Sequence, residues 1–351
     1  MVPRDLLIVV TGASGHVGGL VAAELARRNV PFRAVTRRPE RLPDLGSADV
    51  AVGGYAEPER LMKALESGDR VFMVSMHAPP DRRLELHRAF VDVAVRSRVA
   101  RVVYLSFVGA GPDASFVHAR SHGATETMLA ESGLPFTAVR NAMYADEIAS
   151  WFDSDGRITG PGGDGRISLS YRPELAEAIV GLLTDEANDD RQVVNITGPE
   201  SFSLTALAAA ASEVTGDAYR YAPLDREQWI DHRKSVGRPD WSIEAGISYY
   251  DGVRAGEADV VTDDYRALTG KEPLTIRDVI GLHRAEMPLA SRPPARPGGG
   301  RAKAWVCGAT ASDRPSACMK SKNRPLLRLR PSRSPRPIPP RLRIPALTRR
   351  S

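Results

Sequence analysis

The chain has 351 residues, of which 42% are hydrophobic and 26% are charged. This length suffices for one large α/β domain, and the composition is that of a globular rather than a fibrous or membrane protein. No apolar run is long enough to cross a bilayer, and the amino terminus passes directly into a predicted strand without a signal peptide. We therefore expect a cytoplasmic protein with no membrane partner.

The net charge of +5 conceals two segments of opposite character. Residues 288–351 contain 16 lysines and arginines against one acid, Asp313, which leaves 32 basic and 42 acidic residues in 1–287. The same segment holds 12 of the 27 prolines and both cysteines. We predict a folded part over 1–287 and a disordered, basic, Arg/Pro-rich tail over 288–351. Because the tail has no interleaved aromatics, we do not expect it to bind nucleic acid.

Short apolar runs alternate with helical segments up to about residue 140. Strands are predicted at 6–10, 32–35, 50–52, 71–75, 102–105 and 136–139, and helices at 17–28, 57–65, 82–98 and 119–132. Continuously apolar strands indicate a parallel sheet with both faces covered. The predicted fold class is a Rossmann-type, doubly wound α/β sheet with helices on both faces.

The alternation loosens after Asn141. A glycine-rich loop occupies 160–165, strands are predicted at 167–171 and 193–197, and helices at 173–183, 204–214 and 226–236. This is too little regular alternation for a second Rossmann unit, so we expect 141–287 to form most of a smaller substrate lobe. The charges of 82–98 suggest a solvated helix face, and Trp151, Trp229 and Trp241 suggest internal packing.

A glycine motif follows the first predicted strand and opens the first helix. Gly12, Gly15 and Gly18 have the spacing GxxGxxG. The first permits a tight turn, the second lets the backbone approach a pyrophosphate, and the third lets helix and strand pack closely. The free N–H groups of the helix then face the phosphates. In this context the motif predicts dinucleotide binding.

The end of the second predicted strand indicates which dinucleotide is bound. Folds that prefer NAD place an acidic residue there to bind the ribose 2′-hydroxyl. This chain has Thr36 followed by Arg37 and Arg38. Because a guanidinium forms bidentate bonds with a phosphate, we expect NADP(H) to be preferred over NAD(H).

These motifs together resemble a known family. The residues Thr-Gly-Ala-Ser-Gly-x-Val-Gly, Val-Thr-Arg, Val-Phe-Met-Val-Ser, Val-Tyr-Leu-Ser and Ser-Gly-Leu-Pro-Phe-Thr-Ala-Val-Arg-Asn are similar to those of atypical short-chain dehydrogenases. The resemblance is to the NmrA-like branch with its type-2 NAD(P)H:quinone oxidoreductases, and it runs from about residue 6 to about residue 285. It implies a flavin-free and metal-free NAD(P)H-dependent oxidoreductase, although the branch also contains members that sense the cofactor without turnover.

The resemblance implies a set of cofactor contacts, with the Gly162–Gly165 loop at the substrate mouth. The implied contacts are Gly12, Ala13, Ser14, Gly15, His16, Val17 and Gly18 at the pyrophosphate, Arg37 at the 2′-phosphate, Ser75, Met76 and His77 beside the riboses, Val139, Arg140, Asn141 and Met143 at the nicotinamide, and Arg172 at the cofactor or the lobe.

The catalytic residues of typical short-chain dehydrogenases are only partly present. Ser106 occupies the serine position, but His118 and His122 stand where a tyrosine and a lysine are expected. This departure puts alcohol dehydrogenase chemistry in doubt and still allows quinone reduction, because a histidine or water can supply the proton. Tyr144 is a further candidate, for stacking on a flat substrate, or an ordinary half-buried tyrosine. His118, His122 and Glu126 share one helix face, but without HExxH we expect no metal site.

The leading hypothesis is an NADPH-dependent oxidoreductase that reduces a quinone or a similar small conjugated carbonyl by direct hydride transfer. The first alternative is a non-catalytic NADP(H)-sensing regulator of the NmrA kind that binds a protein partner. The second is an isomerase or reductase of a specialised biosynthetic pathway on the same fold. A homodimer is possible, and the acceptor lies beyond what the sequence determines.

Overall fold

The computed structural model describes residues 7–46 and 48–288. Within them a seven-stranded parallel sheet has the order β10-β6-β5-β4-β1-β2-β3. Its strands are β1 (Ile8–Thr11), β2 (Phe32–Thr36), β3 (Asp49–Val52), β4 (Arg70–Met73), β5 (Arg101–Phe107), β6 (Phe136–Asn141) and β10 (Val193–Ile196). The strand order reverses between β1 and β4, and in such sheets ligands bind at the carboxyl ends beside this switch point.

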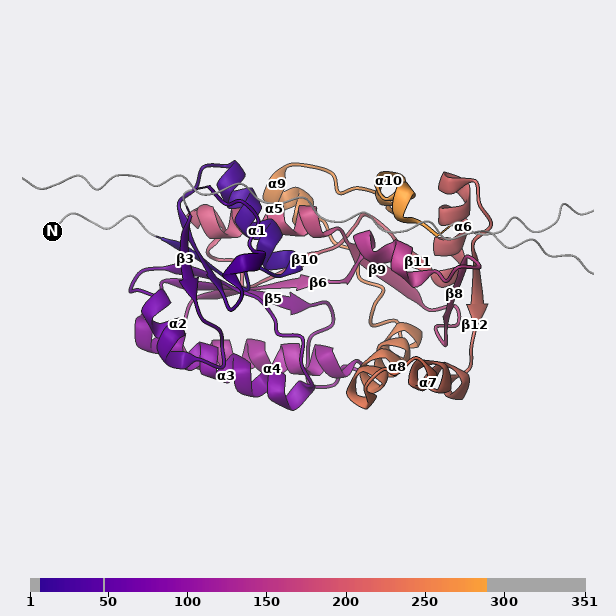
Figure 1. Cartoon of the computed structure of the whole chain (residues 1–351), viewed down its shortest axis with the longest axis horizontal. Coiled ribbons are helices and arrows are strands. Elements are labelled where there is room, and N and C mark those ends of the chain that lie inside the picture. Colours follow the sequence, from indigo (N-terminus) through magenta and orange to yellow (C-terminus); the bar gives the residue numbers. More distant parts are fainter. Residues whose placement is uncertain (1–6, 47, 289–351) are drawn as a thin grey trace, which may run out of the picture. The chain divides into compact units, whose positions relative to one another are not determined.

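Helices cover both faces of the sheet, as the doubly wound class requires (Figure 1). One face carries α1 (His16–Arg27), α5 (Arg172–Thr184) and α9 (Asp264–Thr269), and the other α2 (Pro58–Ala64), α3 (Pro80–Ser97) and α4 (Val117–Glu131). Alternate strand residues enter two cores: Val10 and Phe72 pack under α1 and α5, whereas Val9 and Val71 pack under α2 to α4. Burial on both faces explains the continuously apolar strands.

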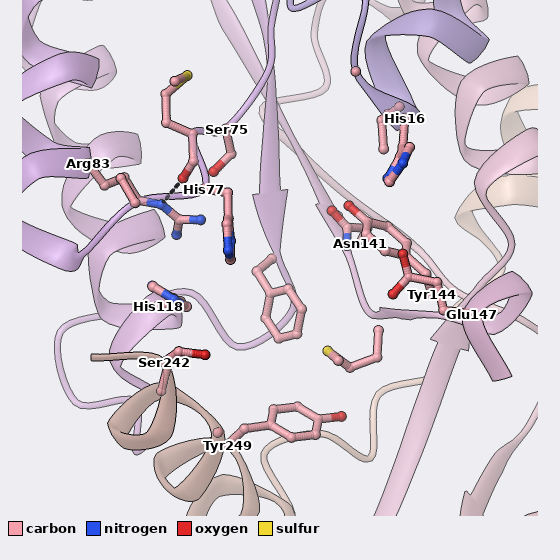
Figure 2. A pocket seen from close by; sticks show the side chains of 18 of the residues that line it. His16, Ser75, His77, Arg83, His118, Asn141, Tyr144, Glu147, Ser242 and Tyr249 are labelled. Atoms are coloured by element: carbon pink, nitrogen blue, oxygen red, sulfur yellow. Dashed lines mark hydrogen bonds between the residues drawn. The ribbon is translucent and has the colours of Figure 1, made fainter. Parts of the chain in front are cut away.

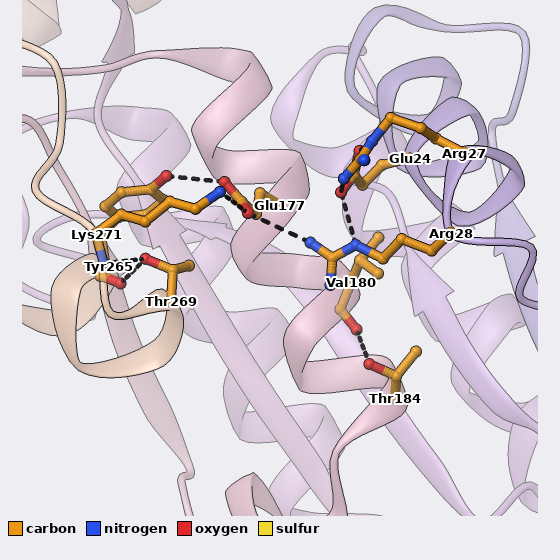
Figure 3. Close-up of polar contacts among 9 residues, drawn as sticks. All are labelled: Glu24, Arg27, Arg28, Glu177, Val180, Thr184, Tyr265, Thr269 and Lys271. Carbon is orange, nitrogen blue, oxygen red and sulfur yellow. Dashed lines mark hydrogen bonds and ion pairs between the residues drawn. The ribbon is translucent and has the colours of Figure 1, made fainter.

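A polar network ties α1 to α5 and α9 on the first face (Figure 3). The Arg28 guanidinium lies 2.6 Å from Glu24 and 3.5 Å from Glu177, and Lys271 Nζ lies 2.5 Å from Glu177. The Tyr265 hydroxyl donates to the same Glu177 carboxylate at 3.0 Å. These contacts hold the helix that follows the glycine turn against two segments far away in sequence.

A second layer of structure follows β6. Its strands are β7 (Met143–Tyr144), β8 (Arg157–Gly160), β9 (Arg166–Ser170), β11 (Ser201–Ser203) and β12 (Arg220–Pro223), in two small sheets of order β11-β9-β7 and β12-β8. Its helices are α6 (Leu204–Thr215), α7 (Arg226–Ser235), α8 (Asp240–Arg254) and α10 (Ile276–Leu282), with the 3-10 turns η2 (Ala145–Trp151) and η4 (Arg284–Glu286). The 3-10 turns η1 (Pro39–Arg41) and η3 (Glu186–Asn188) belong to the Rossmann part.

The predicted lobe differs from the structure in one respect. Both α5 and β10 fall within 141–287, yet they belong to the Rossmann layers: β10 pairs in parallel with β6, and α5 packs on α1. The sequence pattern loosened because β7 to β9 are inserted between β6 and α5. Helices α8, α9 and α10 were not predicted. Leu6 and all of the predicted tail except Pro288 lie outside the described residues.

Candidate functional site

The turn between β1 and α1 can be built only with glycine at two positions. Gly12 has φ +62°, and a Cβ there would collide with the Val74 side chain. A Cβ on Gly18 would collide with the Gly12 carbonyl oxygen. At the N-terminus of α1 no side chain caps the helix and no acidic residue occupies the first turn. The Ala13 and Gly15 amides already donate to the Val35 and Gly12 carbonyls, so the amides of the first turn of α1 are those that can face an anion, and the cradle fits a dinucleotide pyrophosphate.

Thr11 and Tyr55 lock the carboxyl ends of β1 and β4 together. The Thr11 hydroxyl donates to the Phe72 carbonyl at 2.8 Å and accepts from the Val74 amide at 3.0 Å. The buried Tyr55 hydroxyl lies 2.7 Å from Thr11 Oγ1 and donates to the Val74 carbonyl at 2.9 Å. Tyr55 also lines the cavity beside the glycine turn, and the sequence analysis did not single it out.

The end of β2 presents two cations beside the glycine turn. Arg37 and Arg38 are exposed, and within 7–46 and 48–288 neither has an ion-pair partner. A Cβ on Gly54 would lie 2.8 Å from Arg37 Cδ, so the Arg37 stem lies across that glycine. Ser14 Oγ lies 2.6 Å from Thr36 Oγ1, which connects the turn to the strand end. The arrangement suits a phosphate close to the turn.

One cavity of about 1560 Å³ joins this cradle to an aromatic chamber formed with α8. In the chamber, the rings of Phe107, Phe116 and Tyr249 pack edge to face, with centroids 5.2 to 6.4 Å apart. Trp241 lies edge-on to His77 at 5.2 Å and to His118 at 6.3 Å. Figure 2 shows His77 and His118 on one side, Asn141 and Tyr144 on the other, and Tyr249 on α8. Such walls suit a planar, apolar ligand.

Arg83 enters the cavity wall from α3 and is only 6% exposed. Its Nε donates to the Met76 carbonyl at 2.8 Å, and its Nη1 donates to Ser121 Oγ at 3.1 Å. No carboxylate in the part of the chain that the structure describes pairs with it. Burial lowers the pKa of Arg83 from its ordinary value, but an arginine side chain stays protonated in proteins. The wall therefore contains a buried, fixed positive charge.

Three histidines near Arg83 are neutral at neutral pH. Burial, with a smaller contribution from Arg83, lowers the pKa of His118 to about 4 and that of His87 to about 3. The same causes hold the pKa of His122 well below its ordinary value. His87 Nε2 accepts from the Met76 amide, so the proton is on Nδ1 and is donated to Thr125 at 2.9 Å. His122 Nδ1 is bonded to the Tyr104 hydroxyl at 2.9 Å.

Comparison with known proteins shows which family the chain resembles. A model of NAD(P)H-binding proteins matches residues 12–186. An NmrA-like oxidoreductase of Aspergillus flavus is 26% identical, over 78% of this chain and 93% of that protein. The chain resembles the NmrA-like branch of the atypical short-chain dehydrogenases.

Two solved structures extend the comparison of this NmrA-like protein. The NADPH-dependent quinone oxidoreductase of Escherichia coli in complex with NADPH is 26% identical, with a TM-score of 0.72 over 79% of this chain and 99% of that one. A Citrobacter triphenylmethane reductase in complex with NADP(H) is 27% identical, with a TM-score of 0.71 over 78% and 99%. The NmrA-like chain is accordingly an NAD(P)H-dependent oxidoreductase with the Rossmann-type fold predicted for it.

Most of the residues predicted for the site line this cavity. They are Gly12, Ser14, Gly15, His16, Val17, Gly18, Arg37, Ser75, Met76, His77, His118, His122, Asn141, Met143, Tyr144 and Arg172. Four do not line it, namely Ala13, Ser106, Val139 and Arg140.

The four outlying residues have structural partners instead. Ala13 and Val139 are completely buried in the core under α1. Ser106 Oγ donates to Glu126 at 2.5 Å, and Arg140 forms an ion pair with Glu126 at 2.6 Å. Glu126 thus binds both Ser106 and Arg140 in the described structure. Ser106, predicted to be catalytic, and Arg140, predicted to contact the nicotinamide, lie outside the cavity.

Tyr144 and Arg172 form a packed pair on the opposite wall. The Arg172 guanidinium lies over the Tyr144 ring, 5.0 Å from its centroid. Arg172 Nε donates to Asp146 at 2.6 Å, and Nη1 lies 2.9 Å from Glu147. One face of Tyr144 is therefore occupied, and burial raises the pKa of its hydroxyl to about 12. Tyr144 can offer its free edge or face to a ligand, but its phenol is a poor acid.

The sequence analysis missed Arg83 and Trp241. Arg83 was assigned to a solvated helix face, which is wrong, because it shares a buried face with His87 and Phe90. The spacing i, i+4, i+7 was available to show this. Trp229 packs in a core as predicted and Trp151 packs against one, but Trp241 lines the cavity beside His77 and His118. Because α8 follows a weakly patterned segment, no sequence signal indicated which ring would face His118.

No helix in 7–46 or 48–288 is long and apolar enough to span a membrane. Nor does this part of the chain bring together three or more histidine, cysteine, aspartate or glutamate side chains that could hold a metal ion.

The buried histidines predict an acid-sensitive fold. Because the folded-state pKa values of His87 and His122 lie below the unfolded value, the unfolded chain binds more protons as the pH falls below about 6.5. Stability is then complete above that pH and falls by about 1.4 kcal/mol per pH unit for each histidine as the folded pKa is approached. Urea unfolding at pH 7.5, 6.0 and 5.0 gives the free energy of unfolding at each pH and therefore this slope. A change of about 1.4 kcal/mol per pH unit is large enough for the method to resolve. A His87→Gln variant should have a shallower slope, and an equal slope would contradict the assignment.

Proposed function

We propose that this chain reduces a quinone or a similar small conjugated carbonyl with NADPH by direct hydride transfer. The observation that supports this most is the single cavity that begins at the glycine turn and ends in an aromatic chamber. A dinucleotide in the cradle and a planar acceptor in the chamber would share one enclosed space. Holding two reactants in such a space is a large part of what catalysis of hydride transfer requires.

A preference for NADPH is part of the proposal. Arg37 and Arg38 stand at the end of β2 without carboxylate partners among the described residues, next to the turn that would hold the pyrophosphate. No acidic side chain stands in their place to bind a ribose 2′-hydroxyl. A guanidinium there would bind the 2′-phosphate in a bidentate manner.

When bound, NADPH supplies the hydride; the residues of this chain orient the reactants and exclude water. The Gly12 turn would fix one end of the cofactor, and the rings of Phe107, Phe116 and Tyr249 would clamp the acceptor. His118 is close to the chamber, but with a pKa of about 4 it is not an imidazolium at neutral pH. The proton that completes the reduction is therefore assigned to water.

One feature favours the sensor alternative. The positions of the tyrosine and lysine pair hold His118 and His122, and neither is charged near neutral pH. A protein that binds NADP(H) and signals through a protein partner needs no such pair. The aromatic chamber is what favours catalysis over sensing, because a sensor has no need for a second, acceptor-sized compartment.

The deciding experiment is NADPH oxidation by the full chain with and without a panel of quinones, alongside titration of NADPH and NADH. We expect tighter binding of NADPH than NADH, and oxidation that depends on the quinone. A Gly18→Val variant, whose side chain would block the turn, controls for contaminating reductases. Tight NADPH binding without turnover of any acceptor would overturn the quinone proposal in favour of the sensor.

A further inference from the structure

Arg83 is a buried cation whose hydrogen-bonding capacity is only partly used. Of its five N–H groups, one on Nε and one on Nη1 have acceptors within 7–46 and 48–288, and Nη2 has none. The side chain is 6% exposed and lines the cavity. A buried charge without an opposite charge is costly, so such a group is expected where an anion is present in the working state.

The opposite wall of the cavity shows how a buried arginine is ordinarily matched. Arg172 is 11% exposed and pairs with both Asp146 and Glu147. Glu147 and Asp153 are the two carboxylates that line the cavity in the described residues, and Asp153 pairs with Arg157. No lining carboxylate is therefore left to compensate Arg83. The missing charge must come from a ligand or from solvent.

Arg83 lies on the wall where the acceptor would sit. Ser121, which accepts its Nη1 hydrogen bond, donates in turn to the His118 carbonyl at 2.8 Å. Met76, which accepts from its Nε, precedes His77. Both His77 and His118 contact the Trp241 ring of the chamber. Figure 2 shows Arg83 beside Ser75 and His77, on the same side as His118 and Ser242.

We propose that the Arg83 guanidinium binds the anion that forms when a neutral acceptor takes up hydride, and that this site therefore selects neutral over cationic acceptors. The inference rests on the proposed function. In the step, NADPH loses a hydride and becomes NADP⁺, and the quinone gains it and becomes a hydroquinone monoanion. Water then protonates the oxyanion. A positive charge fixed beside that oxygen lowers the barrier, because it interacts more strongly with the product-like anion than with the neutral quinone.

A cationic acceptor would experience the opposite effect. A triphenylmethane dye carries a positive charge before hydride uptake and none afterwards. Arg83 would repel it on binding and gain nothing in the transition state. The charge of the acceptor thus determines the sign of the Arg83 contribution. A residue that only maintained the fold, or only held the cofactor, would affect both acceptors in the same direction.

Equilibrium binding provides a test without turnover. Lawsone, a hydroxynaphthoquinone that is an anion at neutral pH, resembles the reduced acceptor, and its methyl ether is a neutral control of the same shape. Both are titrated into the full chain loaded with NADP⁺, with quenching of tryptophan fluorescence as the signal. We expect Arg83→Gln to weaken lawsone binding roughly ten- to a hundredfold and binding of the ether only slightly. Arg83→Lys, which keeps the charge, should retain most of the preference.

Arg88→Gln is the matched control, because Arg88 is exposed on the same helix and does not line the cavity. It should leave both affinities unchanged. Equal losses of lawsone and ether binding in Arg83→Gln would overturn the inference, as would equal losses in Arg88→Gln. If Arg83→Gln does not fold, the Arg83→Lys comparison decides: a lawsone preference lost despite the retained charge contradicts an anion site.

Steady-state rates provide the second readout. In Arg83→Gln the rate with a neutral quinone should fall relative to the rate with a cationic triphenylmethane dye, and a fall of the same size with both would contradict the inference. The Arg83 inference and the proposed quinone reductase activity can fail independently of each other. Anion binding that depends on Arg83, without turnover of any quinone, would support the anion site and contradict the proposed quinone reductase activity. Quinone turnover without any effect of Arg83 would do the reverse.

Discussion

Replacing Arg37 by glutamate is expected to reverse the cofactor preference of this protein. The change removes a guanidinium that has no competing carboxylate partner among the described residues, and it places a negative charge where the 2′-phosphate would lie. Loss of bidentate, charge-assisted bonds together with the new repulsion should weaken NADPH binding roughly a hundredfold or more. NADH has no 2′-phosphate, and the new carboxylate can accept from its ribose hydroxyls, so its binding should hold or improve.

The measurement is titration of both cofactors by the fluorescence of the reduced nicotinamide. Arg41→Glu is the control, since Arg41 ends the 3-10 turn η1 four residues away, is exposed and does not line the cavity. It makes the same change in charge and should leave the NADPH to NADH ratio close to that of the unmodified chain. If Arg37→Glu and Arg41→Glu change the ratio of NADPH to NADH affinity equally, the effect comes from the overall charge of the surface, and Arg37 does not contact the 2′-phosphate.

Replacing Gly12 by alanine is expected to abolish useful binding of both cofactors. The residue has φ +62°, which costs a side-chain-bearing residue about 1–2 kcal/mol. The added Cβ would also collide with Val74 Cγ1, so the turn has to move away from β4. Because a small displacement of the turn misaligns the amides that would face the pyrophosphate, we expect affinity to fall roughly a hundredfold.

Two further variants separate strain from displacement. Gly46 has the same φ of +62° with nothing within 4 Å of its Cβ position, so Gly46→Ala should cost stability but leave NADPH affinity intact. Adding Val74→Ala to Gly12→Ala removes the colliding methyl group and should recover part of the affinity. Full NADPH affinity in Gly12→Ala alone would show that this turn does not hold the pyrophosphate.

The nucleotide end of the site could be predicted because its determinants are local. Gly12, Gly15 and Gly18 act within one strand, one turn and one helix, and Arg37 follows the next strand, so spacing in the sequence is also spacing in the fold. The parallel sheet could be predicted for a similar reason, since burial on both faces leaves a continuously apolar pattern in the central strands. Element ends differed from prediction by one or two residues in most cases, as fraying termini allow.

The acceptor end could not be predicted in this way. Ser106 was predicted to be catalytic and Arg140 to contact the nicotinamide, but Glu126 of α4 binds both, and only the packed structure brings a carboxylate from one element to two strands. Arg83 was assigned to solvent because charged residues usually lie on exposed faces. The i, i+4, i+7 spacing with His87 and Phe90 indicates that Arg83 is buried, but its partner Ser121 becomes apparent only when α3 is docked on α4.

The fold class, the position of the glycine turn and the cations at the end of β2 follow from the amino-acid sequence alone. These depend on contacts between residues close in the chain. The walls of the proposed acceptor chamber depend on tertiary packing, because the chamber combines Phe107 at the end of β5, His118 on α4 and Trp241 on α8. Such contacts arise from the free energy of packing elements far apart in sequence, and no spacing within a single segment encodes them.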